Sequence, residues 1–495
     1  MNFRFFIVGI ISFWLQTTMG QQVFEWTPRA IQGYQYATSL QLNNALKVVD
    51  EMKKQEPNNM LVYFIEDYID FFNLFIGEER STYQLLKNKK DIRLKMIRKG
   101  NENSPYYKFC QADIYLHWAL VKLKFNEKTS AALDIRKAYS LLNQNENDFP
   151  NFMPNKKSLG VMHALIGTIP SNYKWLSNII GITGTIDQGI QEIQLALNQA
   201  QNKEKIFELE TVVMFAFMML YLQNSPESAW SIVSTSSLNH KTNPLANFAL
   251  ANIASRTGRN EEAIRILKQR PKSQEFLPFY YLDLLEGMVK LKKLDLSAEK
   301  NIQVFLQNFK GENYIKEAFQ KLGWIGILKN NNQSYFRCMQ KCIQKGANET
   351  DEDKSAFFEA QKAKVPHIEL LKARLLSDGG YAIQAHRTLI NASNIIFEDK
   401  EYLLEFNYRL GRSYQMLKNY HDAIETYEKV IEMGENNPAY FACRSALSIG
   451  NIYEDQKKYD KAVSYYEKCL EMEPSEYANG LHQKAEAGIN RIRKK

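Results

Sequence analysis

The sequence predicts an all-α protein in which antiparallel helix pairs stack into an α-solenoid. Two observations support this fold class. The 495 residues include only 13 Pro and 23 Gly, so few positions break a helix. Small and aromatic residues also recur at fixed offsets, which is the pattern expected when one helical unit is repeated along a chain. In such a solenoid each unit packs only on its neighbours, so the chain can lengthen without a new core.

The clearest repeated unit lies near the C-terminus. Gly411 and Gly450 are 39 residues apart, and Ala423 and Ala462 have the same separation of 39 residues. Helices approach closely where small side chains lie at the crossing, so these four positions predict helix contacts. Tyrosines accompany them at matching offsets in the two copies, at Tyr414, Tyr420 and Tyr427 and then at Tyr453, Tyr459 and Tyr466, before Pro474 ends the second copy.

Weaker copies of the unit extend the pattern towards the N-terminus. They are marked by Gly33, Tyr36, Ala45 and Pro57, by Ala229 and Ala263, and by Ala373, Leu376, Ala385 and Leu389. We therefore divide the mature chain into N-terminal divergent repeats (21–205), central divergent repeats (206–350) and C-terminal repeats with a capping helix (351–495). A last helix with one polar face is expected, because a solenoid must cover its final apolar surface.

The first twenty residues differ from the rest of the chain. Arg4 is followed by an apolar run of eleven residues, from Phe5 to Leu15, in which Ser12 is the only polar side chain, and small residues precede a cleavage site between Gly20 and Gln21. This arrangement predicts a secretory signal peptide over residues 1–20. A run of eleven residues is too short to span a bilayer. An uncleaved anchor and a buried first helix are the alternatives. We expect an exported protein that is periplasmic or associated with the cell envelope.

The LG…Y…Y..A...Y signature, repeated within residues 404–474, resembles tetratricopeptide repeats. The wider arrangement resembles the inclusion-body-clearance and tetratricopeptide-39 group, in which divergent helical repeats flank a Gly-rich hydrophobic segment, here residues 158–190. It is also similar to exported proteins of Gram-negative bacteria of the Bacteroidota type, including the stretch from Gly311 to Trp324. The resemblance implies a scaffold that binds partners. The signal peptide departs from the eukaryotic members, so their intracellular roles are not carried over.

Composition and motifs argue against catalysis and against nucleic-acid binding. The net charge of +8 comes from 63 basic and 55 acidic residues, which form no concentrated basic stripe. The sequence lacks a phosphate-binding GxxxxGKS/T loop, an HExxH metal motif and a GxSxG nucleophile motif. We therefore predict that the protein is not an enzyme, that it uses no cofactor and that nucleic acid is not its partner.

The cysteines predict neither a disulfide framework nor a metal site. There are five of them, an odd and scattered set. Cys338 and Cys342 lie four residues apart on one face of a predicted helix, but no His cluster or CxxC motif completes a metal site. We interpret the cysteines as buried thiols. Cys443 and Cys469 are the pair that could meet across a helical hairpin.

The first helices of the repeats predict a concave groove that binds a protein or peptide partner. Its residues come from three successive units, with Leu370 and Arg374 in one, Tyr408, Arg412 and Gln415 in the next, and Arg444, Leu447 and Asn451 in the last. Arg374, Arg412 and Asn451 form a predicted row that would bind a carboxylate or a peptide backbone, because guanidinium groups present planar donors. A merely solvated groove is the alternative interpretation.

The Gly-rich segment 158–190 is the other candidate site. Lys174 is the only charged residue between Lys157 and Asp187, and Tyr173 and Trp175 each combine an apolar ring with one polar atom. Our interpretation is an interior helix pair and turn that seal the solenoid. The alternative is a hydrophobic-ligand or membrane-surface site at Tyr173 and Trp175, with peripheral membrane association.

Overall fold

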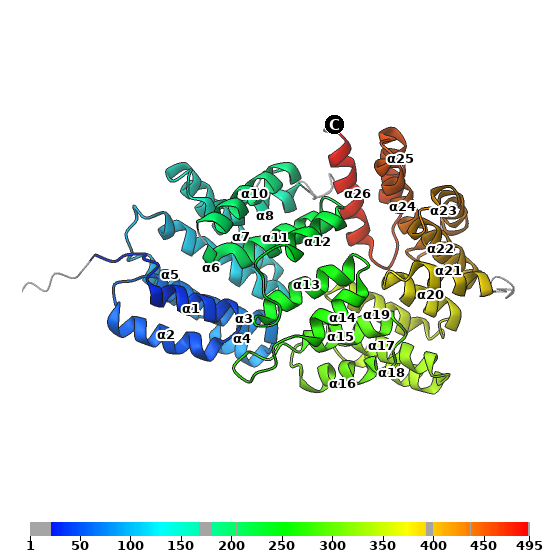
Figure 1. Ribbon diagram of the computed structural model, residues 1–495, viewed down its shortest axis with the longest axis horizontal. Helices are drawn as coiled ribbons and strands as arrows, with labels where there is room; N and C mark the ends of the chain where they lie inside the picture. Colours follow the sequence, from blue (N-terminus) through cyan, green and yellow to red (C-terminus); the bar gives the residue numbers. More distant parts are fainter. Residues whose placement is uncertain are drawn as a thin grey trace, which may run out of the picture.

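The computed structural model describes residues 21–167, 181, 183–203, 205–392, 399–435 and 437–493, and it confirms the predicted all-α fold (Figure 1). These residues form no β-strand, and one isolated bridge joins Val23 to Asn59. Helices that follow one another along the chain pack side by side, so the molecule is a curved stack of helix pairs. The predicted signal peptide, Tyr173 and Trp175 lie outside the described residues.

The N-terminal part of the stack contains helices of unequal length, from 7 residues in α4 to 21 residues in α7. Their bounds are α1 (Pro28–Thr38), α2 (Leu42–Gln55), α3 (Leu61–Gly77), α4 (Arg80–Leu86), α5 (Lys89–Ile97), α6 (Pro105–Lys124), α7 (Lys128–Asp148), α8 (Met153–Ile166), α10 (Ile186–Asn202), α11 (Glu208–Tyr221) and α12 (Pro226–Ser234). Helices α1 and α6 begin at a proline behind a capping side chain, since Thr27 and Ser104 accept backbone N–H hydrogen bonds there.

The C-terminal part of the stack is more regular. Its helices are α13 (Pro244–Arg256), α14 (Asn260–Lys268), α15 (Tyr281–Lys292), α16 (Ala298–Asn308), α17 (Ile315–Leu328), α18 (Asn332–Gln344), α19 (Asp351–Lys362), α20 (Ile368–Asp378), α21 (Ala382–Ala392), α22 (Lys400–Met416), α23 (Tyr420–Gly434), α24 (Phe441–Asp455), α25 (Tyr459–Leu470) and α26 (Ala478–Ile492). Among the helices described in either part, none is long and apolar enough to cross a membrane.

A shared turn joins the two helices of a pair. The turn residue has a positive φ angle, between 49° and 83°, at Leu40, Asn126, Asn224, Gly258, Leu294, Asn330, Gly380, Lys418 and Lys457. Five residues after seven of these positions lies an alanine with 0% exposure, at Ala45, Ala131, Ala229, Ala263, Ala385, Ala423 and Ala462. The same turn and the same small contact residue therefore recur well beyond the two clear C-terminal copies.

The predicted close crossings of the C-terminal repeats are confirmed. A Cβ atom on Gly411 would lie 2.9 Å from the ring of Tyr427, and one on Gly450 would lie 2.6 Å from the ring of Tyr466. The tyrosine rings fill the space that each glycine leaves, so the first helix of a pair packs closely on the second.

The flanks of the Gly-rich segment 158–190 form another close crossing. Helices α8 and α10 pack face to face, and a Cβ atom on Gly160 would lie 2.7 Å from the carbonyl oxygen of Gly189. A Cβ atom on Gly184 would lie 2.6 Å from the Cα atom of His163. In the described part of the segment, glycine therefore allows two backbones to touch, which agrees with the interpretation of an interior helix pair.

The apolar core of the described residues continues from pair to pair. Phe279 packs on both the N-terminal and the central cluster of buried side chains. Tyr281 and Met288 pack on both the central cluster and the one that follows it. Each unit is thus stabilised by its neighbours, as in a solenoid. The predicted boundaries at 205 and 350 stay a prediction.

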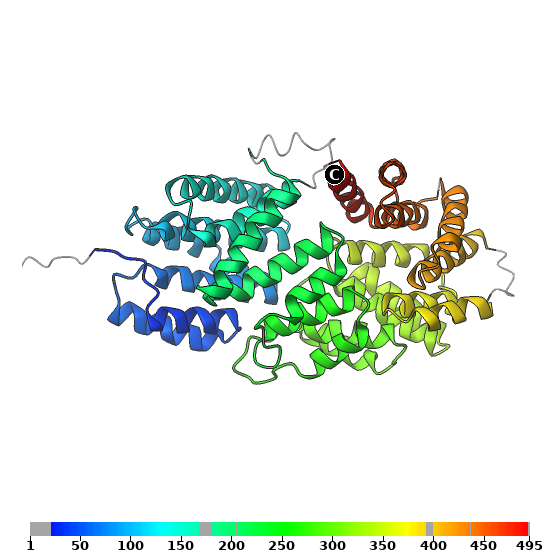
Figure 2. The same cartoon turned by 45° about the horizontal axis from the view of Figure 1, so that its top comes forward.

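The last helix, α26, closes the C-terminal part of the stack into a ring (Figure 2). It packs on α24 and α25, and its Ala487 lies in the central core cluster. Arg491 Nη1 donates to the carbonyl oxygen of Leu222 at 2.8 Å, and Asn490 Nδ2 donates to the carbonyl oxygen of Gly167 at 3.0 Å. The last described helix therefore returns to the middle of the chain and encloses a space.

Candidate binding groove

The ring encloses a groove with a basic wall. Two overlapping cavities, of about 640 Å³ and 450 Å³, occupy this space. Five cationic side chains from five helices line both cavities: Arg256, Arg374, Arg412, Arg444 and Lys484. We name this space the basic groove. Because its walls come from α13, α20, α22, α24 and α26, the ring must close before the groove is complete.

Part of the predicted groove comes together in this space. Arg374, Arg412 and Arg444 lie on α20, α22 and α24, the first helices of three successive pairs. Tyr408 of α22 lines the same wall. The first helices thus face the interior of the ring, where the repeat pattern predicts the concave surface.

Three other predicted residues lie away from the basic groove. Leu370 and Leu447 are buried between helices, with exposures of 0% and 1%, so their side chains offer no surface to a ligand. Gln415 Oε1 accepts a hydrogen bond from the Tyr427 hydroxyl at 2.8 Å, within its own helix pair. Some of the positions predicted to face the groove therefore lie in the core between helices, and others lie in the groove wall.

Of the predicted row of Arg374, Arg412 and Asn451, only the two arginines line the basic groove. Asn451 Oδ1 accepts hydrogen bonds from the Tyr466 hydroxyl at 2.8 Å and from Asn224 Nδ2 at 3.3 Å. The ring closes at this turn of α24, so the position meets the connection between α11 and α12. Closure of the ring, which the repeat pattern does not reveal, removes Asn451 from the row.

Two arginines of the basic groove are paired with carboxylates. Arg412 Nη1 lies 2.5 Å from Asp378 Oδ1, and Arg256 Nη2 lies 3.3 Å from Glu352 Oε1. Burial alone would raise the pKa of Asp378, but the guanidinium groups of Arg412 and Arg374 hold it well below its usual value. Asp378 is therefore a fixed negative charge that positions the arginines beside it.

The other three cations have no carboxylate within ion-pair distance among the described residues. Arg374 stacks on the ring of Trp324, with its guanidinium carbon 4.5 Å from the ring centroid. Arg444 and Lys484 face the same space. Burial, and then the charges of Arg444 and Arg256, lower the pKa of Lys484 to about 7. The groove therefore holds more positive charge than its own carboxylates balance.

Tyrosines complete the wall beside Arg444. The rings of Tyr440 and Tyr477 pack edge to face with centroids 5.2 Å apart. Arg409 has an exposure of 1%, and it donates to Glu405 at 2.8 Å and to the Tyr440 hydroxyl at 3.2 Å. This buried network holds the aromatic wall in one arrangement, so a ligand meets a surface that is already formed.

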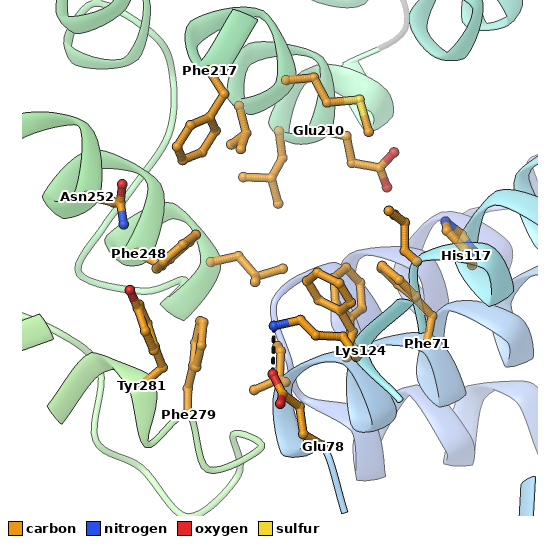
Figure 3. Close-up of a pocket in the computed structure, with 18 of the residues that line it drawn as sticks. Phe71, Glu78, His117, Lys124, Glu210, Phe217, Phe248, Asn252, Phe279 and Tyr281 are labelled. Atoms are coloured by element: carbon orange, nitrogen blue, oxygen red, sulfur yellow. Dashed lines mark hydrogen bonds and ion pairs between the residues drawn. The ribbon is translucent and has the colours of Figure 1, made fainter. Parts of the chain in front are cut away.

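A second space, which we name the apolar chamber, lies between the N-terminal and central helices (Figure 3). Its volume is about 480 Å³. Its walls are mostly apolar and come from α3, α6, α11, α13 and the start of α15, with rings from Phe71, Phe72, Phe75, Phe217, Phe248, Phe279 and Tyr281. Tyr221, Arg256 and Glu352 line both the chamber and the groove, so the two spaces meet at these residues.

Sequence reasoning missed Arg256, Lys484 and the apolar chamber. Arg256 is the last residue of α13, which is the first helix of its pair. Its position in the repeat could therefore have predicted that it faces the interior of the ring. Lys484 lies on the capping helix, where a polar residue indicates a solvated face until the ring closes. The rings of the chamber come from helices far apart in the sequence, so no local pattern reveals them.

The cysteines are mostly buried thiols. Cys110, Cys342, Cys443 and Cys469 are buried, and Cys338 is partly exposed. Cys443 Sγ lies 3.4 Å from Cys469 Sγ across the α24–α25 hairpin. In the part of the chain that the structure describes, no group of three or more His, Cys, Asp or Glu side chains could hold a metal ion.

Residues 402–475 match a family model described as Tetratricopeptide repeat. This stretch carries tetratricopeptide repeats. It includes most of α22 and all of α23, α24 and α25, so the tetratricopeptide repeats supply Arg412 and Arg444 to the basic groove. No curated protein matches the chain. Membership of the inclusion-body-clearance and tetratricopeptide-39 group stays a prediction.

Three solved structures illustrate what the fold is similar to. The P58(IPK) TPR domain is 13% identical, with a TM-score of 0.23, over 85% of this chain and 97% of that chain. An IFIT1 monomeric mutant with Gppp-AAAA is 13% identical, with a TM-score of 0.29, over 83% and 88% of the two chains. A second IFIT1 mutant, with m7Gppp-AAAA, is 14% identical, with a TM-score of 0.28, over 82% and 99%. Superpositions at such TM-scores carry no conclusion about function.

Proposed function

We propose that the protein is an interaction scaffold whose basic groove binds an extended, acidic segment of a protein partner. One observation carries the proposal: Arg374, Arg444 and Lys484 converge on one groove with no ion-paired carboxylate among the described residues. Partly buried cations without such partners are unfavourable, and charge-assisted hydrogen bonds to a bound carboxylate would offset that cost. The tetratricopeptide repeats in the wall agree with a protein partner.

The charge pattern favours a polypeptide over a polyphosphate chain. Asp378, Glu352, Asp351 and Glu349 line the basic groove among the arginines. A nucleic acid carries a negative charge at every phosphate and would meet these carboxylates, whereas a peptide can separate its carboxylates with neutral residues. An oligoadenylate is included in the test as a competitor, because it carries a negative charge at every phosphate.

The first experiment locates the partner segment. A photoreactive phenylalanine analogue replaces Tyr440 in the groove, and in a matched control it replaces Tyr465 on α25, whose hydroxyl donates to Glu428 at an exposed site. We expect cross-links from position 440 to one protein segment with a net negative charge. Cross-links from position 465 alone, or to a segment without acidic residues, would contradict the proposal.

The second experiment measures affinity with a synthetic copy of that segment. Arg374→Glu and Arg444→Glu are each expected to weaken binding at least tenfold, because each reverses a charge in the groove. The control is Arg387→Glu on α21, which makes the same charge change on an exposed second-helix surface. Equal binding by all three variants, or displacement of the peptide by low concentrations of oligoadenylate, would overturn the proposal.

We also propose that the protein acts outside the cytoplasm after residues 1–20 are removed. The support is the apolar run from Phe5 to Leu15 and the small residues before Gly20. N-terminal sequencing of the protein purified from its own cell envelope tests this proposal. We expect a protein that begins at Gln21. A protein that retains residues 1–20 and is found in the cytoplasmic fraction would contradict the proposal.

A further inference from the structure

The apolar chamber has the size and lining of a ligand site. Packed protein interiors leave few voids larger than a water molecule, whereas this one measures about 480 Å³, within the range of roughly 300–1,000 Å³ that small-molecule sites occupy. Phe71, Phe217 and Phe248 are half-buried rings that border it (Figure 3). Water in contact with so much aromatic surface is unfavourable, so an apolar occupant would be stabilised there.

The ionisable side chains Lys124, Glu210 and His117, which line the chamber, already have protein partners. The pairs are Lys124 with Glu78 at 2.6 Å, Lys157 with Glu210 at 2.5 Å and His117 with Asp67 at 2.8 Å. Their hydrogen-bonding capacity is largely used within the protein. The greater part of the chamber wall therefore offers a ligand hydrophobic contact rather than hydrogen bonds.

The end of the chamber that meets the basic groove is different. Asn252 has an exposure of 6%, and its Oδ1 atom is buried without a hydrogen-bond partner. Arg256 lies one helical turn further along α13, and its nearest carboxylate contact is the 3.3 Å pair with Glu352. Tyr281 lines the same end. The Arg256 guanidinium and the Tyr281 hydroxyl would donate hydrogen bonds to a carboxylate at this end of the chamber, whereas Asn252 Oδ1 can only accept one.

This distribution excludes an extended peptide from the chamber. Each residue of a peptide carries a backbone donor and an acceptor that must be satisfied when they are buried. The aromatic rings of the wall cannot satisfy a series of backbone donors and acceptors. The ionisable side chains beside the rings are already paired within the protein. A ligand that fits must concentrate its polarity at one end and be hydrocarbon elsewhere.

We propose that the apolar chamber binds a long-chain fatty acid. Its carboxylate lies at Arg256, beside the Tyr281 hydroxyl, and its hydrocarbon chain follows Phe248 and Phe217 towards Phe71. The assignment goes beyond the peptide-binding role of the basic groove, and it does not depend on it. The two spaces meet at Arg256, so the fatty acid carboxylate lies where the chamber opens into the groove.

The test uses the full mature protein and a fluorescent fatty acid, cis-parinaric acid. We expect saturable binding of one molecule per chain, with displacement by palmitic acid at least tenfold more effective than displacement by hexadecanol, which lacks the carboxylate. Phosphatidylcholine vesicles form a second arm, in which the protein alone should not sediment with the vesicles. Absent binding, or sedimentation of the protein with the vesicles, would overturn the proposal.

Two kinds of variant test the sites of the hydrocarbon chain and of the carboxylate separately. Val213→Trp and Met214→Trp each fill the chamber from α11 without adding charge, and both should abolish binding of the acid and of the alcohol. Arg256→Gln should weaken the acid about tenfold and leave the alcohol unchanged. Arg265→Gln is the matched control, because Arg265 pairs with Glu262 on the exposed face of α14.

Circular dichroism and thermal melting establish that each variant is folded. A folded Val213→Trp or Met214→Trp protein with undiminished binding would place the ligand elsewhere and contradict the proposal. Equal losses for the acid and the alcohol in Arg256→Gln would contradict the assigned position of the carboxylate. Neither result bears on the peptide-binding experiments with Arg374→Glu and Arg444→Glu, so the two proposals can fail separately.

Discussion

The basic groove and the apolar chamber are both built from helical hairpins of the same kind. The two sites differ in which hairpins supply their walls. The groove takes Arg374, Arg412 and Arg444 from the first helices of three successive pairs. The chamber takes Phe71 from α3 and Phe248 from α13, two helices far apart in the sequence. The repeat fixes which helices face inward, but the curvature of the whole stack decides which side chains meet.

The ring closure is the contact on which the groove depends, and breaking it has the largest expected effect. Arg491 lies 2.7 Å from Glu454 and donates to the carbonyl oxygen of Leu222 at 2.8 Å, with only 9% of its side chain exposed. Arg491→Ala removes the two guanidinium hydrogen bonds to the nearly buried carboxylate of Glu454, so we expect the free energy of unfolding to fall by roughly 3 kcal/mol. Urea denaturation measures this change.

A local measurement sharpens the same prediction. In Arg491→Ala, amide hydrogen exchange should accelerate around Leu222 and in α26, where the ring closes, more than in α1 and α2. Arg387→Ala on the exposed face of α21 is the control, and its stability should change little. Uniform acceleration along the chain, or none near Leu222, would show that the ring closure contributes no local stability.

The fold was predictable because its cause is local. Gly411 and Gly450 each pack against a tyrosine ring that leaves no room for a larger side chain. Because the same contact recurs in each unit, glycine recurs at the same position of the sequence repeat. Ala131 follows the same turn geometry, but Lys122, Lys128 and Ile135 stand at the offsets that tyrosines occupy in the C-terminal copies, so the repeat pattern does not reveal its unit. Close backbone approach requires the small contact residue, whereas the large residues around it differ between the copies within this chain.

The site was predictable only in part because its cause is not local. The periodicity places Arg374 and Arg412 on inward-facing helices, and both line the basic groove. It also places Asn451 there, although that side chain is hydrogen-bonded to Tyr466 and to Asn224 of the α11–α12 connection. Contacts between segments more than 200 residues apart leave no trace in a repeat pattern.

The crossing glycines differ from the other glycines in a way that stability measurements can detect. A Cβ atom on Gly450 would lie 2.6 Å from two ring carbons of Tyr466, so Gly450→Ala should destabilise the protein by about 2 kcal/mol through overpacking. Gly480→Ala is the matched control, because its nearest neighbour would lie 3.5 Å away and alanine favours the helix. Equal thermal stabilities for the two variants would contradict the packing assignment.

The basic groove should respond to pH, whereas the crossings should not. Lys484 has a pKa of about 7 beside Arg444 of α24, Arg256 of α13 and Glu352 of α19, so it loses its charge as the pH rises through that value. A bound carboxylate favours charged Lys484, and affinity for the acidic segment should therefore fall up to about tenfold between about pH 6 and pH 8.

Lys484→Arg tests the origin of that pH dependence. Arginine stays charged over this range, so the variant should bind the acidic segment with nearly the same affinity at both pH values. Isothermal titration calorimetry of the two proteins provides the comparison. A pH dependence that persists in Lys484→Arg would assign the titration to another group.

The smallest expected effect is a change of mass. Cys443 Sγ and Cys469 Sγ lie 3.4 Å apart, and Cys443 is one of the residues that line a small cavity between α23, α24 and the end of α25. If the protein is exported to an oxidising compartment, this pair should form an intramolecular disulfide, which removes two hydrogen atoms. Intact-mass analysis of the protein from its own envelope should detect the loss, and Cys443→Ser should abolish it.

The most direct test of the groove is a hydrogen-exchange footprint of the bound acidic segment. Binding inside the ring predicts slower exchange in α20, α22, α24 and α26, the helices that carry Arg374, Arg412, Arg444 and Lys484. It predicts no change in α21, α23 and α25, the second helices of the same pairs. Protection confined to the second helices would contradict the basic groove as the binding surface.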